Sequence, residues 1–280
     1  MAAIAAHGSF SEAARRLGLT HSAISQQVRA LEDELGVALV DRSFKPPVLT
    51  DRGRALVERA EKIGALTDEI RAMAHDPGLV GSMILGAVPS VMLGLLPRAL
   101  GAMRRANPGL RCEIRVALSG DLTAALRSGE IDAALATAPD HPIEGIRVRD
   151  VAAEPLAVIA PADAPETTDV DLLQSYPFIW FSRRTWAGQQ IERLLLERGV
   201  FVRGLTEVES LEAVSALVEQ GLGVSVAPQL IGGPALRPGL RALPFGRPQA
   251  VRRLAFFERD ASPETATSRE LYRRLCDEAR

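Results

Sequence analysis

Residues 9–49 place two short helices and a hairpin in a fixed order, and this order constrains the fold more than any other part of the chain. Ser9 can cap a helix, and Glu12, three residues later, completes a capping box. Gly18 suits the left-handed turn that ends this helix, and Thr20 can cap the next one. The segment therefore predicts two helices joined by a tight turn.

The second helix, predicted over residues 20–35, divides into an apolar face and a polar face. Apolar residues recur at steps of three and four, as on one side of a helix: Ile24, Val28, Leu31 and Leu35. The polar candidates are Thr20, His21, Ser22, Ser25, Gln26 and Arg29. Ser and Gln can reach base edges in the major groove of DNA, and Arg can contact a base or a phosphate. Any solvated helix can have such a face, but its place after a capped turn favours a DNA-reading helix.

The next segment, VALVDRSFKPPVL, has two short β-prone runs on either side of a polar tip and two prolines. This pattern predicts a wing hairpin. The tip charges Arg42 and Lys45 are candidates to lie on DNA phosphates, and a solvated loop is the alternative. The formal net charge of the chain is −2, so the motif, rather than the charge, predicts nucleic-acid binding.

A long helix is predicted from a cap at Thr50 to about residue 75. Its apolar positions alternate steps of four and three, as in a coiled-coil seam. These positions are Leu56, Ala60, Ile63, Thr67, Ile70 and Ala74. We expect the seam to pack against the same helix of a second subunit, with packing against its own domain as the alternative. The sequence Asp-Pro-Gly at 76–78 predicts a hinge.

These residues carry a family resemblance. The segment SFSEAARRLGLTHSAISQQVRALEDELGVALVDR resembles the DNA-binding region of the LysR-type transcriptional regulators. A weaker similarity to the family's effector-binding domain runs through LLPRAL, NPGLRCEIRV, LRSGEIDAAL and LVEQGLGVSVAP. The chain departs from the family pattern at Val40, where Phe is common. It also begins inside the family's first helix, so we expect residues 2–6 to form only the end of that helix.

The resemblance implies an all-α winged helix-turn-helix domain at 1–49 and a linker and dimerisation helix with a hinge at 50–78. It implies an α/β effector-binding domain at 79–280, with two Rossmann-like lobes of the periplasmic binding protein type II kind. It also implies a homodimer or homotetramer that binds double-stranded, inverted-repeat operator DNA, responds to a small-molecule effector and contacts RNA polymerase.

From residue 79 the pattern itself alternates strands and helices, which predicts α/β units with mostly parallel sheets. The expected strands are near 82–88, 111–117, 132–137, 147–152, 156–160, 177–181, 202–208, 223–227, 240–245 and 251–258. The expected helices are near 92–105, 120–128, 186–198, 210–220 and 264–279. The pair Arg252-Arg253 is expected to lie in solvent at the end of a strand.

Several predicted strands end in small polar residues just before a helix, where a helix N-terminus offers free N–H groups. This placement predicts an effector site for a carboxylate or another polar metabolite. Its candidate residues are Ser90, Ser119, Thr137, Phe181, Ser182, Arg183 and Trp186. The serines can instead be plain helix caps, Trp186 can be a core aromatic, and Arg183 can lie in solvent.

The remaining features exclude other classes of protein. The sequence has no GxSxG, HExxH, GxGxxG or Walker motif, and its two cysteines, Cys112 and Cys276, form no metal-binding or disulfide pattern. No cofactor or metal is therefore expected. With no secretion signal and no membrane-length apolar run, the expected location is the cytoplasm. An enzyme or a cytoplasmic solute-binding protein on the same two-lobed fold remains the alternative.

Overall fold

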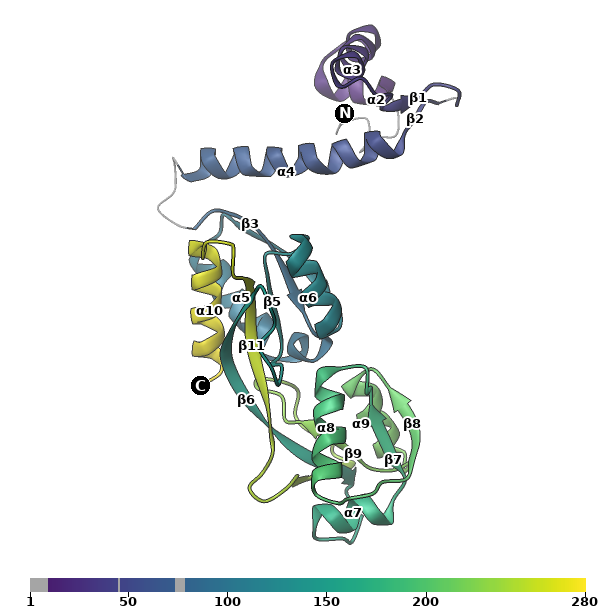
Figure 1. Cartoon of the computed structure of the whole chain (residues 1–280), viewed down its shortest axis with the longest axis vertical. Coiled ribbons are helices and arrows are strands. Elements are labelled where there is room, and N and C mark those ends of the chain that lie inside the picture. Colours follow the sequence, from purple (N-terminus) through teal and green to yellow (C-terminus); the bar gives the residue numbers. More distant parts are fainter. Residues whose placement is uncertain (1–9, 45, 74–78) are drawn as a thin grey trace. The chain divides into compact units, whose positions relative to one another are not determined.

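The computed structural model describes residues 10–44, 46–73 and 79–280, and the chain divides into two compact units, 1–77 and 78–280 (Figure 1). The expectations for residues 2–6, Ser9, Lys45, Ala74 and the hinge at 76–78 fall outside the described residues. We describe each unit separately.

The first unit contains the two predicted helices and the tight turn between them. Gly18 has a φ of 65° at the turn, and the Thr20 hydroxyl accepts a hydrogen bond from the amide of Ala23 at 3.2 Å. A small core joins the helices to the hairpin: Ala13, Ala14, Ile24, Val28 and Val40. The elements are α2 (Phe10–Leu17), α3 (His21–Leu35), β1 (Val40–Asp41), β2 (Val48–Leu49) and α4 (Asp51–Met73).

Only the first half of the apolar stripe predicted on α3 is buried. Ile24 and Val28 are buried, but Leu31 is half-buried and Leu35 is 46% exposed. The reason is that α3 ends at Gly36, with φ 65°, beyond the reach of the small core. The stripe therefore anchors α3 through its first half only.

The wing and the long helix are joined through the start of α4. Strands β1 and β2 pair antiparallel, with Val40 opposite Leu49, as a hairpin requires. The Thr50 hydroxyl accepts a hydrogen bond from the amide of Gly53 at 3.0 Å, which is the predicted cap. A Cβ on Gly53 would lie 2.1 Å from the carbonyl oxygen of Leu39, so only glycine lets α4 approach the wing this closely.

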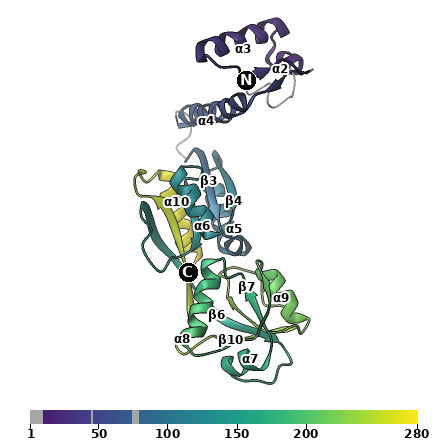
Figure 2. The same cartoon turned by 45° about the vertical axis from the view of Figure 1, so that its right-hand side comes forward.

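The second unit has two lobes that are connected by two long strands, β6 (Ile146–Pro161) and β11 (Val251–Arg259) (Figures 1 and 2). The first lobe comprises β3 (Gly81–Ala87), η1 (Pro89–Leu93), α5 (Leu95–Ala106), β4 (Leu110–Val116), α6 (Ser119–Ser128), β5 (Ala133–Thr137) and α10 (Ala266–Glu278). The second comprises α7 (Asp169–Ser175), β7 (Phe178–Phe181), α8 (Trp186–Glu197), β8 (Gly204–Val208), α9 (Leu211–Glu219), β9 (Ser225–Pro228) and β10 (Leu240–Pro244).

The sheet topology corrects two expectations. The strands expected at 147–152 and 156–160 are one strand, β6. The described sheets are also mixed rather than mostly parallel: β3 pairs parallel with β4 and β5, and β7 with β8, whereas β6 and β11 pair antiparallel with each other and with their other neighbours. The cause is that the chain leaves the first lobe along β6 and returns along β11, so these two strands must run in opposite directions.

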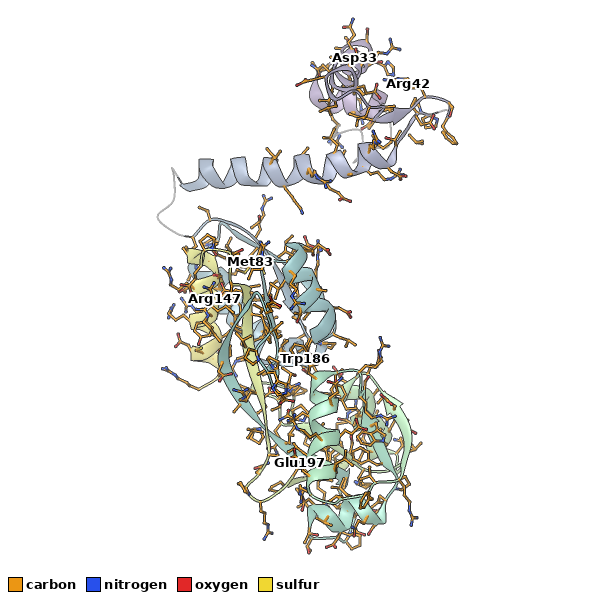
Figure 3. The ribbon with its side chains drawn as sticks, in the orientation of Figure 1. Asp33, Arg42, Met83, Arg147, Trp186 and Glu197 are labelled. Atoms are coloured by element: carbon orange, nitrogen blue, oxygen red, sulfur yellow. The ribbon has the colours of Figure 1, made fainter. Side chains whose placement is uncertain are left out.

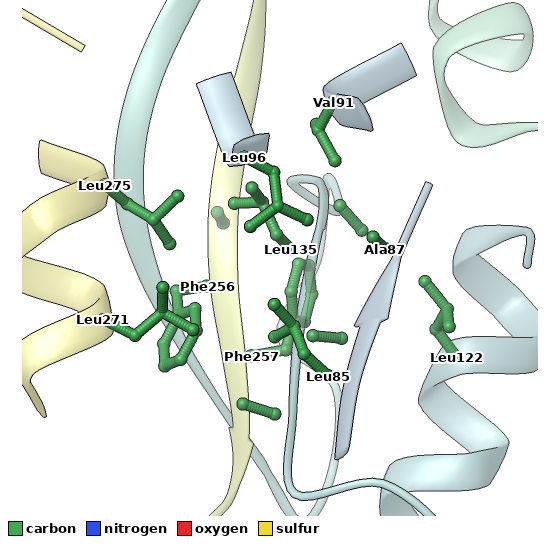
Figure 4. Close-up of a cluster of buried hydrophobic side chains, with 14 of the residues drawn as sticks. Leu85, Ala87, Val91, Leu96, Leu122, Leu135, Phe256, Phe257, Leu271 and Leu275 are labelled. Carbon is green, nitrogen blue, oxygen red and sulfur yellow. The ribbon is translucent and has the colours of Figure 1, made fainter. Parts of the chain in front are cut away.

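Each lobe has its own apolar core. In the first lobe, Leu271 and Leu275 of α10 cover one side of β11, and Leu122 of α6 lies on the other side (Figure 4). The second lobe contains separate clusters around Phe178 and Val214. The two lobes are thus built to meet across β6 and β11 rather than to share one core. No helix among the described residues is long and apolar enough to cross a membrane.

Candidate nucleic-acid interface and effector cleft

The polar face of α3 is available to a partner. Thr20, His21, Ser22, Gln26 and Arg29 are exposed, and Ser25 is half-buried. Arg29 has no hydrogen-bond or ion-pair partner among the residues that the structure describes. Because Ile24 and Val28 fix the opposite face in the small core, Ser22, Gln26 and Arg29 point away from the domain.

Arg42, a predicted phosphate contact that follows β1 (Figure 3), is held by a carboxylate of its own domain. Its Nη2 donates to Oε2 of Glu32 at 2.8 Å, while Oε1 of Glu32 accepts the amides of Leu39 and Val40 at 2.8 and 3.0 Å. Burial alone would raise the pKa of Glu32, but the hydrogen bonds from Arg42 and the two amides outweigh it and lower that pKa. Arg42 therefore braces the wing against α3, a role that the sequence pattern did not indicate.

The seam predicted on α4 is described only over its first half. Leu56 is half-buried, Ala60 is exposed, and Ile63 is 65% exposed. The side chains of Thr67 and Ile70 lie outside the described residues. Val57, on another face of α4, is the residue that packs into the helix's own domain, with 6% exposure. The apolar surface at Ile63 is therefore separate from the surface that holds α4 to its own domain.

Four of the predicted effector residues meet in one cleft between the lobes of the second unit. Ser90, Ser119 and Thr137 come from the first lobe, and Phe181 comes from the second. Residues that the sequence analysis did not select complete the lining: Val88, Pro89, Leu118, Thr185, Ala187, Glu209 and Arg252. The cleft encloses about 20 Å³, which is room for little more than one water molecule.

The other three predicted residues lie elsewhere. Ser182 is buried in the turn before α8, where its carbonyl accepts the Thr185 hydroxyl at 2.7 Å. Arg183 points to the surface, pairs with Glu207 at 3.1 Å and covers the ring of Trp180. Trp186, at the start of α8 (Figure 3), packs against Phe257 of β11, with ring centroids 6.2 Å apart. These three residues are therefore not part of the lining of the cleft that Phe181 reaches.

Two hydroxyls in the cleft have no internal partner. Ser119 and Thr137 are each only 4% exposed, yet neither hydroxyl forms a hydrogen bond within the described part of the chain. Thr185, in contrast, caps α8 by accepting the amide of Gly188 at 2.9 Å. The hydroxyls of Ser119 and Thr137 are therefore free both to donate and to accept at the cleft surface.

Arg252 was expected to lie in solvent at the end of a strand, but its side chain is buried, with 1% exposure. It lies opposite Glu154 in the β6–β11 pairing and donates Nε and Nη2 to Oε2 of that residue. Its Nη1 donates to the Ser90 hydroxyl at 2.8 Å. Alternation along VRRLAFFER was the available signal, since it puts Arg252 on the same face as Leu254 and Phe256.

The cysteines do not form a pair. Cys112 lies on β4 and Cys276 on α10, and both are free thiols. Although the Cys112 residue is exposed overall, burial of its thiol and the nearby Asp132 carboxylate raise its pKa to about 11. Cys112 is therefore a protonated, weakly nucleophilic thiol at neutral pH.

Comparison with known proteins decides the family. Residues 77–280 match the LysR substrate binding domain, and residues 1–54 match the bacterial regulatory helix-turn-helix protein of the lysR family. The chain belongs to the LysR family. It is a LysR-type transcriptional regulator, as the resemblance predicted, with the expected combination of a helix-turn-helix and a two-lobed α/β domain.

Its relatives are regulators rather than enzymes, which confirms the prediction that the chain is not an enzyme. The RuBisCO operon transcriptional regulator of Allochromatium vinosum is 31% identical over 229 residues, covering 80% of this chain and 76% of that protein. A probable hydrogen peroxide-inducible genes activator of Mycobacterium avium is 30% identical over 278 residues, covering 96% and 89%.

Solved structures of the same family share the fold over nearly the whole chain. A cysteine mutant of Corynebacterium glutamicum OxyR is 26% identical, with a TM-score of 0.70 and coverage of 99% of this chain and 88% of that one. A full-length OxyR variant from Pseudomonas aeruginosa is 26% identical, with a TM-score of 0.62 and coverage of 99% and 92%.

Proposed function

We propose that this LysR-type regulator binds an inverted-repeat operator as a homodimer or homotetramer, and that a small molecule between the lobes changes this binding and the contact with RNA polymerase. The exposed polar face of α3 carries the proposal. Its N-terminal turns offer Ser22, Ser25 and Gln26, and such turns are the part of a recognition helix that enters the major groove.

The roles on DNA follow from the availability of each side chain. Ser22, Ser25 and Gln26 read base edges, and Arg29 contacts a base or a phosphate because its guanidinium has no internal acceptor among the described residues. Arg52, at the start of α4, is likewise exposed and unpaired among these residues, so we add it as a phosphate contact. Arg42 supports the interface indirectly, by holding the wing in place through Glu32.

The oligomer is proposed from α4. A long helix with Ile63 65% exposed buries that side chain when it pairs with a second copy. Pairing also doubles the number of DNA contacts, which a domain without a strong positive charge needs in order to bind one site tightly.

The effector is proposed to be a carboxylate or another polar metabolite in the cleft lined by Ser90, Ser119 and Thr137. One relative is named as a probable hydrogen peroxide-inducible genes activator, but we do not propose that Cys112 senses peroxide. Oxidation by peroxide starts from a thiolate, and the pKa of about 11 keeps Cys112 protonated.

Fluorescence anisotropy with the full chain tests the proposal. The probe is a labelled duplex from the DNA upstream of the regulator's own gene, and the control is a duplex of the same composition in shuffled order. We expect tighter binding to the natural duplex, a footprint with two-fold symmetry, and a stoichiometry of two or four subunits. Equal affinity for both duplexes would contradict operator recognition.

A further inference from the structure

The tip of the wing is apolar as well as exposed. Phe44 is 56% exposed, and Val48, four residues later at the start of β2, is 43% exposed. Pro46, between them, is exposed too. Single apolar side chains are ordinary on a protein surface, but these three lie within five residues of one hairpin. The wing therefore presents an apolar edge in addition to the charges that the sequence analysis selected.

Several hydrogen-bond donors of this loop are committed or missing. Ser43 gives both its amide and its hydroxyl to Oδ1 of Asp41, at 2.9 and 2.6 Å. Arg42 donates to a carboxylate of α3, and the two prolines at 46–47 have no N–H. A loop that binds phosphate presents free N–H and O–H groups, and the described part of this loop has few of them. The loop is therefore better suited to an apolar surface than to a row of phosphates.

The loop is also held in place. Glu32 of α3 accepts the amides of Leu39 and Val40 at the base of the wing, and Val40 is buried in the small core. The hydrogen bonds within 41–43 and the two prolines restrict the loop itself. Phe44 is therefore presented on a rigid support, and little conformational freedom is lost when it meets a partner.

The wing adjoins the end of α3 that is not proposed to read bases. Glu32 lies near the C-terminal end of this helix, whereas Ser22, Ser25 and Gln26 lie in its first turns. With those turns in the major groove, a hairpin beside the other end of α3 crosses a sugar–phosphate backbone to the neighbouring minor groove. Proteins contact that groove with apolar side chains, phenylalanine and proline among them.

We propose that Phe44 is a minor-groove contact of the wing, and that its ring packs against the sugars and base edges of an A·T step on each side of the operator. A G·C pair adds the guanine N2 amino group to the minor groove, and a phenyl ring offers this donor no acceptor. Phe44 thus selects A·T pairs outside the bases that α3 reads. The inference rests on the proposed function and deepens it, by naming a residue that determines specificity.

Footprinting and base substitution test the contact. Hydroxyl-radical footprints of the full chain on the upstream duplex locate the sugars that the wild type protects and Phe44→Ala leaves open. The pairs at those positions are then made A·T, G·C or inosine·C. Inosine·C lacks the N2 amino group, so its minor groove resembles that of A·T while its major groove resembles that of G·C. We expect the wild type to bind the A·T and inosine·C duplexes alike and the G·C duplex about tenfold more weakly.

The variants separate an apolar contact from a phosphate contact. Phe44→Ala should bind the A·T duplex about tenfold more weakly and lose its preference over G·C. Its salt dependence should not change, whereas Arg52→Ala should reduce the slope against salt by about one. Leu35→Ala is the matched control, because Leu35 is 46% exposed in the same unit but lies at the end of α3, off the wing. Since Phe44 is exposed, thermal unfolding of Phe44→Ala should match the wild type.

Four results would overturn the inference: no protected sugar depends on Phe44, the wild type binds G·C as well as A·T, inosine·C behaves like G·C, or Phe44→Ala lowers the salt slope as Arg52→Ala does. A wild type that prefers the upstream duplex to the shuffled one but gives any of these results retains operator recognition without this contact. A wild type without that preference loses operator recognition instead, and alternating A·T, inosine·C and G·C duplexes then decide the role of Phe44 by the same comparison.

Discussion

Arg252 and Glu154 lie directly opposite each other on the two strands that cross between the lobes, and both side chains are at most 2% exposed. The place where the lobes join therefore contains a buried ion pair as well as apolar contacts. Removing one partner of such a pair leaves an uncompensated charge away from water, which is far more costly than losing a surface ion pair.

We expect Glu154→Gln to destabilise the protein by about 3–5 kcal/mol, because Arg252 stays charged and buried. Asp150→Asn is the control on the same strand. Asp150 pairs with the exposed Arg253, and loss of a surface pair costs about 0–1 kcal/mol. Urea unfolding of the full chain, followed by circular dichroism, gives both values. A Glu154→Gln protein within about 1 kcal/mol of the wild type would mean that other groups already neutralise Arg252.

Gln26→Ala should weaken operator binding by about 1–3 kcal/mol and relax the base preference at one position in each half-site. Gln27 is the control. It follows Gln26 in the sequence and is also exposed, but it projects from a different side of α3, closer to the face of Ile24 and Val28. Gln27→Ala should bind the operator like the wild type. Anisotropy titrations against single-base variants of the operator measure both effects. A loss of affinity that is equal in the two variants would remove Gln26 from the reading surface.

The lowered pKa of Glu32 predicts that acid loosens the wing. A carboxyl whose pKa is lower in the folded state stabilises that state above its ordinary pKa of 4.5, and the contribution is lost as the pH falls through the lowered value. We therefore expect exchange protection of the Leu39 and Val40 amides to decrease below this pH.

Hydrogen exchange with mass spectrometry, corrected for the intrinsic pH dependence of exchange, follows the wing. Glu32→Gln should lower the protection at neutral pH and remove its dependence on acid. Glu34→Gln, two residues later and exposed, should behave like the wild type. An identical acid response in Glu32→Gln would show that this carboxyl does not hold the wing.

The sequence was sufficient to predict helices, turns and strand ends that depend on neighbouring residues. Caps at Thr20 and Thr50 and the glycine at 18 define the first unit, and strand ends before helices located Ser90, Ser119 and Thr137, which the structure brings together. Contacts between distant segments were not accessible. The Arg42–Glu32 brace spans ten residues, and Arg252 reaches Glu154 across 98. From the sequence alone, Arg42 is therefore expected on a DNA phosphate and Arg252 in solvent.

The turn after β7 shows a second kind of limit. Ser182, Arg183 and Trp186 follow a strand that does reach the cleft, but the tight turn closed by Thr185 directs them elsewhere. Sequence spacing cannot give side-chain direction in an irregular turn, whereas it does so in a helix or a strand. Helix α7 was missed for a related reason, since seven residues are too few for a periodic pattern.

Gly94 provides a test of how closely the lobes are connected. A Cβ at this position would lie 2.3 Å from the carbonyl oxygen of Ile231, whose amide is bonded to Glu154. We expect Gly94→Ala to destabilise the protein by about 1–3 kcal/mol, because backbone must move to make room. Gly101, in the middle of α5, has only the end of the Arg105 side chain within 4 Å. Gly101→Ala should be stabilising by up to about 1 kcal/mol. Equal melting temperatures for the two variants would contradict this close contact.

Ile63→Asp should separate the subunits. If Ile63 lies in the seam between two copies of α4, the substitution puts a charge without a partner into an apolar interface. Operator binding should be lost at the same time, because one half-site offers too few contacts. Lys62→Asp places the same side chain one residue earlier, off the seam, and should keep the oligomer. Sedimentation equilibrium of the two variants gives the subunit number, and a stable Ile63→Asp dimer would place the subunit contact on another surface of the chain.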